Sequence, residues 1–482
     1  ARHLGLRVDY LPHDVRDEEK ELCRLTFEVT DMLKNPQGSL HGGAMCSAMD
    51  ISMGHLVNKV AGPGATIEMK VQFLRPVIEG TVTVEGQFTK RGRSLSFMES
   101  RLMGPDGKLA ALATATWKMP TYRCFRTSLM LMTKPDLMDE VRSRFAHVAE
   151  CPFEGPRVFF ENAGGALTLN SVVETSAKFA AIPDNQGRDN PAAHALMAII
   201  DKAKADMRVL FNAPEGQFFV GESGTELLFR LIRTAIVVTP AGKVFSSTVE
   251  HPATRSAASK WSATMGKEHV YIHHNDATGA VDAEAYAAQV TPDAQVVTIL
   301  HTSPVTGMGM DVAAISKVIR AVAPDCFIIV DGIQHAAHGR RDIASYGSDG
   351  YVVSPYKVFS RHGYGAAWVS DRLSALPHEH LLDAPGDPWE FGTRDTGAYA
   401  TFSDVVEYFE WLGSQFTEDT DRRARIEAAG EAIHAHEDDL TTAIIHGTGN
   451  QKGLVDMPSV TIIGGVDNPR REGLVSIAVD GM

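Results

Sequence analysis

Cysteine is scarce in this chain of 482 residues. The five cysteines, Cys23, Cys46, Cys124, Cys151 and Cys326, are odd in number and widely spaced, which excludes a disulfide framework. No two of them have the spacing of a metal-binding pair, so no metal site is expected. Scattered thiols of this kind are typical of reduced cysteines, and we therefore expect a cytoplasmic protein.

Long apolar runs and an excess of basic charge are also absent. No run reaches the roughly 18 residues that a membrane helix requires, and the first residues lack the apolar core of a signal peptide. Lys and Arg number 46 against 60 Asp and Glu, a net charge of −14 that repels polyanions. We expect a soluble protein that binds neither membranes nor nucleic acid, and the length predicts two or three domains.

The first 120 residues are rich in strand patterns around one helix. Ile67, Met69, Val71 and Phe73 alternate with polar residues, which predicts a strand with one buried face. Further strands are predicted over residues 81–90, 95–103 and 109–118, and a buried helix over 43–56. These elements predict an α+β domain over residues 1–120.

The pattern changes after Pro120. Residues 121–156 hold several prolines around an amphipathic stretch and are interpreted as a linker that includes the first helix of the next domain. From residue 157 to 482, short apolar runs alternate with helical segments, for example 192–210 and 311–322. Such alternation predicts an α/β domain in which helices cover both faces of a mostly parallel sheet.

The segment from Asn35 to Asp50 concentrates the polar groups of the first domain. Gly42 and Gly43 stand at the start of the predicted helix, where free amide N–H groups and the helix dipole favour an oxyanion. Asp50 follows two turns later in an apolar helix, where an unpaired carboxylate costs several kcal/mol. The alternative is that His41 caps the helix and Asp50 accepts from a loop amide.

This half of the chain resembles the PaaI-type hotdog-fold acyl-CoA thioesterases. The resemblance rests on Asn35-x-x-Gly-x-Leu-His41-Gly42-Gly43, on Asp50, and on Phe73-Leu-Arg-Pro76 and Arg91-Gly-Arg93 in the strands that follow. It implies that Asp50 is the base or nucleophile, that Gly42 or Gly43 polarises the thioester carbonyl, and that Asn35 and His41 shape a site between two subunits. Lys90, Arg91 and Arg93 would meet CoA phosphates, or form a solvated charge cluster.

Polar residues end two apolar runs in the second domain. Asp331 and Gln334 follow one predicted strand, and Ser354 and Lys357 follow another, at the strand ends where open α/β sheets bind ligands. An acid and a lysine so placed suit pyridoxal 5′-phosphate, which takes the lysine as a Schiff base and needs a carboxylate at its pyridine nitrogen. A plain Asp331–Lys357 salt bridge is the alternative.

Three other segments support a cofactor site. Gly224 and Thr225 form a turn before a predicted helix, which can present N–H groups and a hydroxyl to a phosphate. His251 follows a strand and offers a ring that could stack on a planar group. Glu390-Phe-Gly-Thr393 supplies a further turn for close approach.

In this order the motifs resemble the class V aminotransferase family, which includes cysteine desulfurases, lyases and epimerases. The resemblance implies that Lys357 binds pyridoxal phosphate, Asp331 pairs with its ring nitrogen, His251 stacks on the ring, and Gln334 lies near the phenolic oxygen. It further implies a phosphate held by Gly224, Thr225 and Ser354, with Thr393 reaching it from the partner subunit. Asn162 would lie near the substrate.

Several positions depart from the family pattern. Pro304 stands where an Asn often contacts the cofactor, and Tyr356 replaces the His that often precedes the lysine. Family members continue beyond Met482 with the rest of a small domain. No cysteine follows Cys326, which begins an apolar strand and should be a buried, inert thiol, so the thiolate that a desulfurase requires is absent after Lys357.

Together these observations predict a two-module enzyme. Its main function would be pyridoxal-phosphate chemistry on an amino acid or amine, of transaminase, lyase or epimerase type, and acyl-CoA would be the partner of the first domain. Acyl-CoA hydrolysis as the main activity, or a hotdog half that only binds acyl-CoA or dimerises, remain alternatives. Both resemblances imply sites at two-fold interfaces, so a homodimer or a higher symmetric oligomer is expected.

Overall fold

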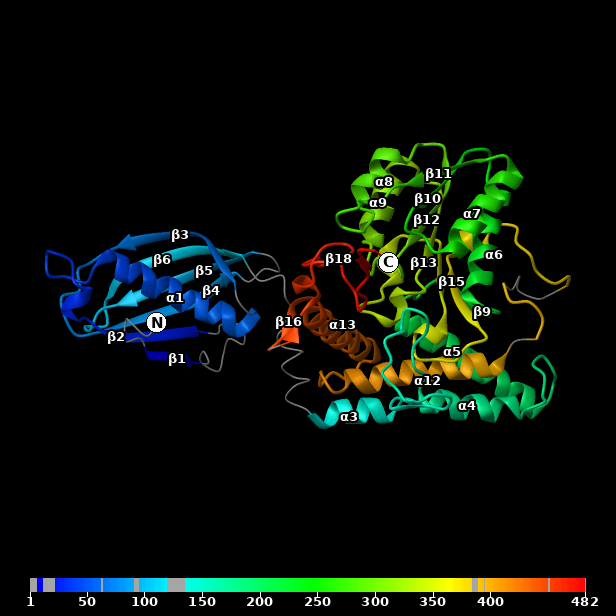
Figure 1. Ribbon diagram of the computed structural model, residues 1–482, viewed down its shortest axis with the longest axis horizontal. Coiled ribbons are helices and arrows are strands. Elements are labelled where there is room, and N and C mark those ends of the chain that lie inside the picture. Colours follow the sequence, from blue (N-terminus) through cyan, green and yellow to red (C-terminus); the bar gives the residue numbers. More distant parts are fainter. Residues whose placement is uncertain are drawn as a thin grey trace. The chain divides into compact units, whose positions relative to one another are not determined.

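The structure is a computed structural model that describes residues 7–11, 22–61, 64–90, 95–118, 135–383, 389–393, 395–449 and 451–481. The chain forms two compact units, Ala1–Leu129 and Met130–Met482 (Figure 1). Among the described residues, no helix is both long and apolar enough to cross a membrane.

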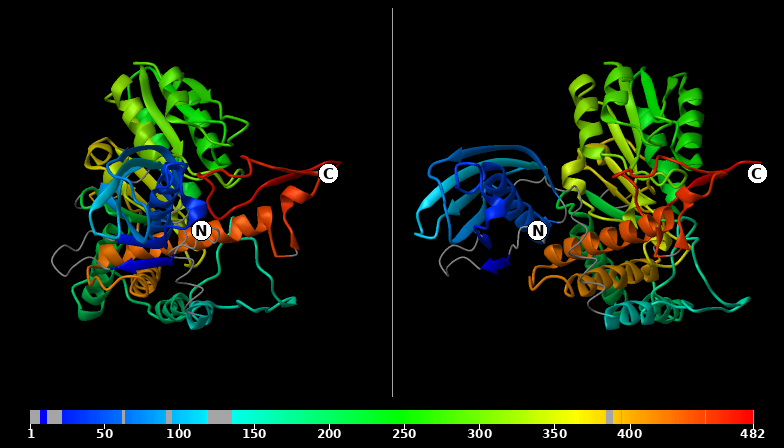
Figure 2. Two further views of the ribbon diagram at one scale, coloured as in Figure 1. Left: turned by 90° about the vertical axis from the view of Figure 1, so that its left-hand side faces the viewer. Right: turned by 60° about the vertical axis from the view of Figure 1, so that its left-hand side comes forward.

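The first unit is one antiparallel sheet packed on one long helix. Its strands are β1 (Arg7–Leu11), β2 (Leu22–Glu28), β3 (Ala65–Phe73), β4 (Thr81–Lys90), β5 (Leu95–Met103) and β6 (Leu109–Lys118), in the spatial order β1-β2-β4-β5-β6-β3. The 3-10 turn η2 (Asp31–Leu33) precedes helix α1 (Gly42–Ala61). Figure 2 shows from two further sides how the sheet curls around this helix. This is the predicted hotdog fold.

One face of α1 makes the core of this unit. Met45, Met49, Met53 and Leu56 are buried against inward side chains of β2, β4, β5 and β6. The close approach of α1 to β4 depends on Gly86, because a Cβ there would lie 2.8 Å from the Ser52 carbonyl carbon. Alternation of apolar and polar residues along the strands thus places one face of the sheet on the helix.

The predicted buried face of β3 is wrong in part. Met69 and Val71 are half-buried against the core, but Ile67 and Phe73 are exposed by 56% and 54%. β3 lies at the edge of the sheet, and the register with β6 shifts between Thr66 and Glu68, which places Ile67 at the irregularity. The alternation predicts the strand but cannot tell an edge strand from a central one.

The second unit contains a seven-stranded sheet in the order β11-β10-β12-β13-β14-β15-β9. The strands are β9 (Gln217–Gly221), β10 (Lys243–Ser247), β11 (Glu268–Ile272), β12 (Ala294–Leu300), β13 (Phe327–Asp331), β14 (Gly350–Val353) and β15 (Gly365–Val369). β15 alone runs antiparallel to its neighbours. The mostly parallel sheet is confirmed.

Helices cover this sheet. They are α3 (Pro135–Ser143), α4 (Asn170–Ala180), α5 (Pro191–Phe211), α6 (Gly224–Val238), α7 (Pro252–Met265), α8 (Ala283–Gln289), α9 (Val312–Val322), α10 (Ile343–Tyr346), α11 (Asp371–Ser374), α12 (Thr396–Gly413) and α13 (Arg422–His446). In Figure 1, α6 and α7 lie on one side of the sheet, and α8 and α9 lie on the other. Two clusters of buried apolar residues, one on each face of the sheet, make up its core.

Short elements complete the second unit. They are the strands β7 (Glu150–Cys151), β8 (Gly155–Pro156), β16 (Gly447–Thr448), β17 (Gln451–Lys452), β18 (Val460–Ile462) and β19 (Ile477–Val479), and the 3-10 turns η3 (His335–Ala337), η4 (Pro355–Lys357) and η5 (Leu454–Asp456). The turns η3 and η4 directly follow β13 and β14, so they place the polar residues of the predicted site at two adjacent strand ends.

Candidate active sites

Asp331 ends β13 and is almost completely buried. Its Oδ1 accepts from the Ile333 amide at 3.1 Å, and its Oδ2 accepts from the Thr254 hydroxyl at 3.1 Å. Burial raises the pKa of Asp331 above its ordinary value, although the Ile333 amide and the charge of His251 favour the ionised form. A carboxylate has about four lone-pair positions, so Asp331 keeps acceptor capacity for further donors.

Lys357 ends the turn η4, one strand away from Asp331. Its Nζ donates to Gln334 Oε1 at 2.9 Å, and no ion pair joins Lys357 to Asp331 in the described ranges. Burial lowers the pKa of the Lys357 amine, while the nearby charge of Asp331 raises it. The structure thus brings Lys357, Gln334 and Asp331 together, in an arrangement that differs from a plain salt bridge.

The first residues of α6 lie close to Ser354, which directly follows β14. Ser223 caps the helix by accepting from the Glu226 amide at 3.1 Å, and the first helical N–H groups, at Gly224 and Thr225, have no partner within the helix. A Cβ on Gly224 would lie 2.3 Å from Ser354 Oγ, so only glycine allows this close approach. Gly224 and Ser354 are buried, whereas Thr225 is exposed.

The remaining predicted cofactor and substrate residues lie on loops or at a helix start. His251 precedes α7, and its Nδ1 accepts from the Ala253 amide at 3.1 Å. Its charge acts on Asp331, which places the two side chains near each other. Thr393 and Asn162 are exposed, and within the described part of the chain neither forms a hydrogen bond with Lys357.

Two buried polar residues beside Asp331 escaped the sequence analysis. Thr254 is the hydroxyl donor described above, contributed by α7 from 77 positions earlier in the chain. Glu250 is almost completely buried, as Asp331 is. Its Oε1 accepts from Thr298 Oγ1 at 3.0 Å. Burial and the charge of Asp331 raise the pKa of Glu250 to about 8. Glu250 directly precedes His251, but the pattern around His251 did not indicate the burial of Glu250 or the contact of Thr254 with Asp331.

A second buried cluster adjoins Gln334. The rings of His301 and His335 stack with centroids 3.5 Å apart. Glu472 accepts from Thr302 Oγ1 at 2.7 Å and lies 2.8 Å from His335 Nδ1. Burial opposes ionisation of Glu472, but His335, His338 and His301 outweigh burial and hold its pKa at about 2. Glu472 therefore ties a segment near the C-terminus to the two loops that follow β12 and β13.

The structure shows the contacts of Pro304 and Tyr356, the two residues that replace common residues of the family. Pro304 lies in the turn between Thr302 and Gly309, which pairs with the backbone of residues 470–472. The ring of Tyr356 stacks on His362 with centroids 4.3 Å apart, and its carbonyl accepts from the Ala166 amide. Tyr356 thus connects the Lys357 turn to the stretch that carries Asn162.

In the first unit, Asp50 lies on α1 opposite the edge strand. It is half-buried, and its Oδ1 accepts from the Thr66 hydroxyl of β3 at 2.7 Å. His41 Nδ1 accepts from the Gly43 amide at 2.9 Å, as the capping alternative predicts. Since this bond occupies the Gly43 N–H, Gly42 is the amide that remains available at the start of the helix.

Asn35 organises the turn before this helix. Its Oδ1 accepts from the amides of Gln37 and Ser39, and its Nδ2 donates to Ser39 Oγ at 3.0 Å. It therefore acts on His41 through the shape of the turn. Of the predicted basic cluster, Lys90 ends β4, whereas Arg91 and Arg93 lie outside the described residues.

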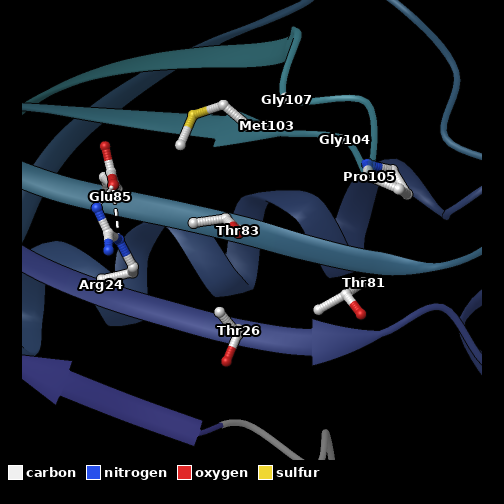
Figure 3. Close-up of a pocket in the computed structure, with 9 residues that line it drawn as sticks. All are labelled: Arg24, Thr26, Thr81, Thr83, Glu85, Met103, Gly104, Pro105 and Gly107. Atoms are coloured by element: carbon white, nitrogen blue, oxygen red, sulfur yellow. Dashed lines mark hydrogen bonds and ion pairs between the residues drawn. The ribbon is translucent and has the colours of Figure 1, made fainter.

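An open pocket of about 750 Å³ lies on the other face of the sheet (Figure 3). Outward side chains of β2 and β4 line it, among them Thr26, Thr83 and the ion pair of Arg24 with Glu85. Since Asp50 lies on the helix that covers the opposite face, this pocket is separate from the predicted thioester site.

The structure also describes the Cys326 thiol and the side chains that could bind a metal ion. Cys326 is 1% exposed, so the prediction that this thiol is buried is confirmed, and burial raises its pKa to about 11. Across the described ranges, no group of three or more His, Cys, Asp or Glu side chains is arranged to hold a metal ion.

Comparison with known proteins identifies both units. The family model "Aminotransferase class-V" matches residues 158–482, and the model "Thioesterase superfamily" matches residues 37–111. The thioesterase region therefore precedes the aminotransferase region.

Individual relatives are similar to one unit each. A probable cysteine desulfurase of Mycoplasma genitalium is 26% identical over 226 residues, 45% of this chain and 53% of that protein. A putative esterase of Saccharolobus solfataricus is 34% identical over 101 residues, 20% of this chain and 67% of that protein. The chain spans about half the length of the first two cysteine desulfurase-type relatives.

Solved structures show the same fold in the second unit. The apo cysteine desulfurase of Thermococcus onnurineus matches with a TM-score of 0.58 and 17% identity, over 71% of this chain and 82% of that one. Because the class-V match covers well over half of the sequence, the chain belongs to the class-V aminotransferase family and carries a thioesterase-superfamily domain before the aminotransferase region.

Proposed function

We propose that this protein is a pyridoxal-phosphate enzyme that acts on an amino acid or amine. The observation that supports it best is the half-buried Lys357 amine, held by Gln334 one strand away from the buried carboxylate of Asp331. The likeness to cysteine desulfurases and the class-V match agree with this proposal.

Two observations indicate that the residues present could hold this cofactor. Gly224 and Ser354 approach so closely that any side chain at position 224 would fill the space at the start of α6, where a phosphate would meet helix N–H groups. Asp331 is a buried carboxylate that accepts from two donors among the described residues, which leaves acceptor capacity for a protonated ring nitrogen.

Each side chain has a definite task in this proposal. Pyridoxal phosphate, when bound, acts as an electron sink for the substrate. Lys357 would hold the cofactor and then take or return the proton at the substrate Cα, since its lowered pKa favours the neutral amine. Thr254 would orient Asp331, and Gln334 would orient Lys357.

We propose amino-group exchange, elimination or epimerisation, rather than desulfuration, as the chemistry that the residues up to Met482 can supply. A desulfurase needs a thiolate to take the sulfur atom, and no cysteine lies between Phe327 and Met482. Cys326 itself is buried with a raised pKa. The names of the relatives, in contrast, suggest desulfuration, so cysteine is one of the substrates to include in any panel.

Borohydride reduction tests the assignment of Lys357. The purified protein should be yellow, and reduction should attach the cofactor to the peptide that carries Lys357, as read by mass spectrometry. Lys357→Ala should lose this adduct, whereas Lys317→Ala, a change of the same kind on the exposed side of α9, should keep it. An undiminished adduct in Lys357→Ala would show that another lysine holds the cofactor.

We also propose that the first unit hydrolyses acyl-CoA thioesters. Asp50 lies half-buried on α1, held by Thr66, and the Gly42 amide begins the same helix. A carboxylate on the helix and a free N–H at its start supply a base or nucleophile and a donor for an oxyanion. A hotdog unit that only binds acyl-CoA, or only dimerises, is the alternative.

Replacement of Asp50 separates these alternatives. Asp50→Asn should lower the acyl-CoA hydrolysis rate by about 10²–10⁴-fold, the range typical of acid–base catalysis, without changing the cofactor absorbance. Asp106→Asn, on an exposed hairpin of the same unit, is the matched control. Equal hydrolysis rates for Asp50→Asn and the unchanged protein would favour the binding module.

A homodimer is the assembly that we propose. β3 is an edge strand and exposes Ile67 and Phe73, and Leu74 and Ile78 beyond it are exposed by 52% and 61%. An apolar edge strand invites pairing with another strand. A second copy of this chain offers the same edge and would bury it symmetrically.

A further inference from the structure

A row of polar side chains crosses part of the sheet of the aminotransferase unit, beginning beside Asp331. Its members are Glu250, which follows β10, Thr298 of β12, Ser246 of β10 and His269 of β11. Ser246 and Thr298 are completely buried and Glu250 is 3% exposed, although the core around them is apolar. His269 is half-buried on β11, the edge strand of the sheet. We call these four residues the polar row.

Hydrogen bonds connect the polar row from end to end. Thr298 Oγ1 lies 3.0 Å from Glu250 Oε1 and 2.9 Å from Ser246 Oγ. Ser246 Oγ in turn lies 3.0 Å from His269 Nε2. All three distances are in the range of well-formed hydrogen bonds. The polar row therefore joins a carboxyl group in the core to a ring that is partly open to solvent.

The hydrogens of the polar row have two possible arrangements. A hydroxyl carries one hydrogen, so Thr298 donates either to Glu250 or to Ser246 and accepts from the other. If Glu250 is protonated, each bond runs outward, from Glu250 through the two hydroxyls to His269 Nε2. If Glu250 is ionised and His269 Nε2 carries a hydrogen, each bond runs inward. Both arrangements use every bond, and they differ in which end holds the hydrogen.

The surroundings of Glu250 direct its hydrogen to Oε1. Oε2 has no partner among the described residues, and the second neighbour of Oε1, the Ser247 amide at 3.4 Å, can only donate. Thr298 Oγ1 is thus the acceptor for the carboxyl hydrogen. Burial raises the pKa of Glu250 to about 8 and lowers the pKa of His269, so the outward arrangement prevails near neutral pH.

Three titratable side chains adjoin the polar row. The charge of Asp331 adds to the effect of burial on the pKa of Glu250, and Tyr286 of α8 donates to the Thr298 carbonyl at 3.4 Å. The Tyr271 ring lies beside the His269 ring, with centroids 4.4 Å apart. Across the residues that the structure describes, none of the three forms a hydrogen bond with the side-chain oxygens of the row. The hydrogens of the two hydroxyls therefore move only along the row.

We propose that the polar row is a proton path between Glu250 and solvent. Outward transfer breaks the O–H bond of Glu250, passes one hydrogen along each hydrogen bond of the row, and forms an N–H bond at His269 Nε2. The products are a Glu250 carboxylate and a His269 imidazolium, and the half-buried ring then releases one hydrogen to water. Inward transfer reverses these steps, so the transfer needs no other reactant.

The path allows the charge of two buried acids to change without unfolding. Because Asp331 and Glu250 act on each other's charge, Glu250 gives up or takes a proton when a ligand brings a positive charge to Asp331. This use rests on the proposed function, in which Asp331 pairs with a protonated ring nitrogen. The transfer itself does not rest on it. Without a path, a proton on a buried carboxyl leaves only when the fold opens locally, and destabilising substitutions would then speed its release.

Exchange of the Glu250 carboxyl hydrogen for deuterium tests the path. Infrared spectroscopy near neutral pH detects the C=O band of a protonated carboxyl, and loss of the band in Glu250→Gln assigns it. Thr298→Val replaces the hydroxyl by a methyl group of similar size, so exchange should slow at least tenfold. Thr298→Ser keeps a hydroxyl and should exchange at the wild-type rate. Unchanged or faster exchange in Thr298→Val, or no Glu250 band in the wild type, would overturn the proposal.

A matched substitution separates the path from stability. Thr401 of α12 is also completely buried, and its hydroxyl lies 3.3 Å from Tyr364 Oη. Thr401→Val removes a buried hydroxyl outside the polar row, so exchange at Glu250 should stay unchanged or become faster. Ser246→Ala interrupts the row at its next position and should slow exchange as Thr298→Val does. Equal slowing in Thr401→Val would overturn the proposal.

The test remains separate from that of the proposed function. Cofactor absorbance and the borohydride adduct at Lys357 are measured on the same preparations. A protein that carries the cofactor but exchanges equally fast in the wild type and in Thr298→Val would overturn the path alone. A protein that lacks the cofactor but exchanges through the polar row would overturn the proposed function, and with it this use of the path, but not the path itself.

Discussion

Two buried carboxyl groups lie near each other behind the proposed cofactor site. Asp331 has two donors, whereas Glu250 has Thr298 Oγ1 at 3.0 Å and a long contact from the Ser247 amide at 3.4 Å. Its Oε2 has no partner among the residues that the structure describes. Burial and the charge of Asp331 raise the pKa of Glu250 to about 8, so Glu250 is largely protonated near neutral pH.

The raised pKa of Glu250 predicts how its replacement changes stability with pH. The folded protein holds this proton more tightly than the unfolded chain, so stability falls as pH rises from the ordinary value of 4.5 to about 8. Glu250→Gln removes this loss and should stabilise the protein by a few kcal/mol at pH 8.5, with little effect at pH 5, when urea unfolding is compared at the two pH values.

An exposed glutamate provides the control for this measurement. Glu284→Gln, on the open side of α8, should leave the free energy of unfolding within about 0.5 kcal/mol at both pH values. If Glu250→Gln were neutral or destabilising at pH 8.5, ionisation of Glu250 would not be costly in the folded protein, and its pKa would not be raised by burial.

At the residue scale, the sequence predicted the site residues at the strand ends but not the side chains that form hydrogen bonds with them. Asp331, Gln334 and Lys357 follow apolar runs, and adjacent parallel strands bring such ends together. Thr254 and Glu472 act across 77 and 137 residues, on Asp331 and His335, through contacts that no local pattern encodes. A helix cap formed by His41 at Gly43 was one of two hypotheses for His41. The spacing of the residues alone could not decide between them.

Among the elements, α12 and α13 pack most closely where Gly413 meets the backbone of Arg425. A Cβ on Gly413 would lie 1.8 Å from the Arg425 carbonyl oxygen, a backbone atom that cannot rotate away. Asp206 of α5 holds Arg422 at 2.8 Å at the same end of α13, which fixes the crossing further. The contact therefore depends on the absence of a side chain at position 413.

Gly413→Ala should force the two helices apart. Overpacking typically costs 1–3 kcal/mol, and a clash with backbone belongs at the upper end, so we expect a loss of at least about 2 kcal/mol in urea unfolding. Gly266→Ala is the control, since its Cβ would meet nothing within 4 Å and only the left-handed backbone, with φ of 65°, costs about 1 kcal/mol. Equal losses would mean that α12 and α13 can separate freely.

Strand patterns show what periodicity can and cannot predict. β4, β5 and β6 were expected over their observed bounds because their apolar positions alternate regularly. β2 was not predicted, although Cys23, Leu25 and Phe27 alternate with polar residues and are buried, so a signal was present. For β3 the exposure differs from the prediction because edge position depends on strand order, which the sequence of one strand does not contain.

At the scale of the whole molecule, each unit has a hydrophobic core of its own. The core of the first unit is built on methionines of α1, such as Met49, and those of the second on the two faces of its sheet, with Phe402 of α12 in the larger cluster. A chain with separate cores need not unfold in one transition. Their separate cores predict that the stability of each unit is set by its own residues.

Matched core truncations test this expectation through hydrogen exchange of both units. Met49 and Phe402 are fully buried, so truncation to Ala should cost about 2–5 kcal/mol in either unit. Met49→Ala should lower amide protection across β4, β5 and β6 and leave β12, β13 and β14 unchanged, because the two sets of strands share no buried contact within either core. Phe402→Ala should give the reverse pattern. Loss of protection in both units from either single substitution would show that the thioesterase-type and aminotransferase units fold as one cooperative body, and activity losses in one unit could then no longer be assigned to residues of that unit alone.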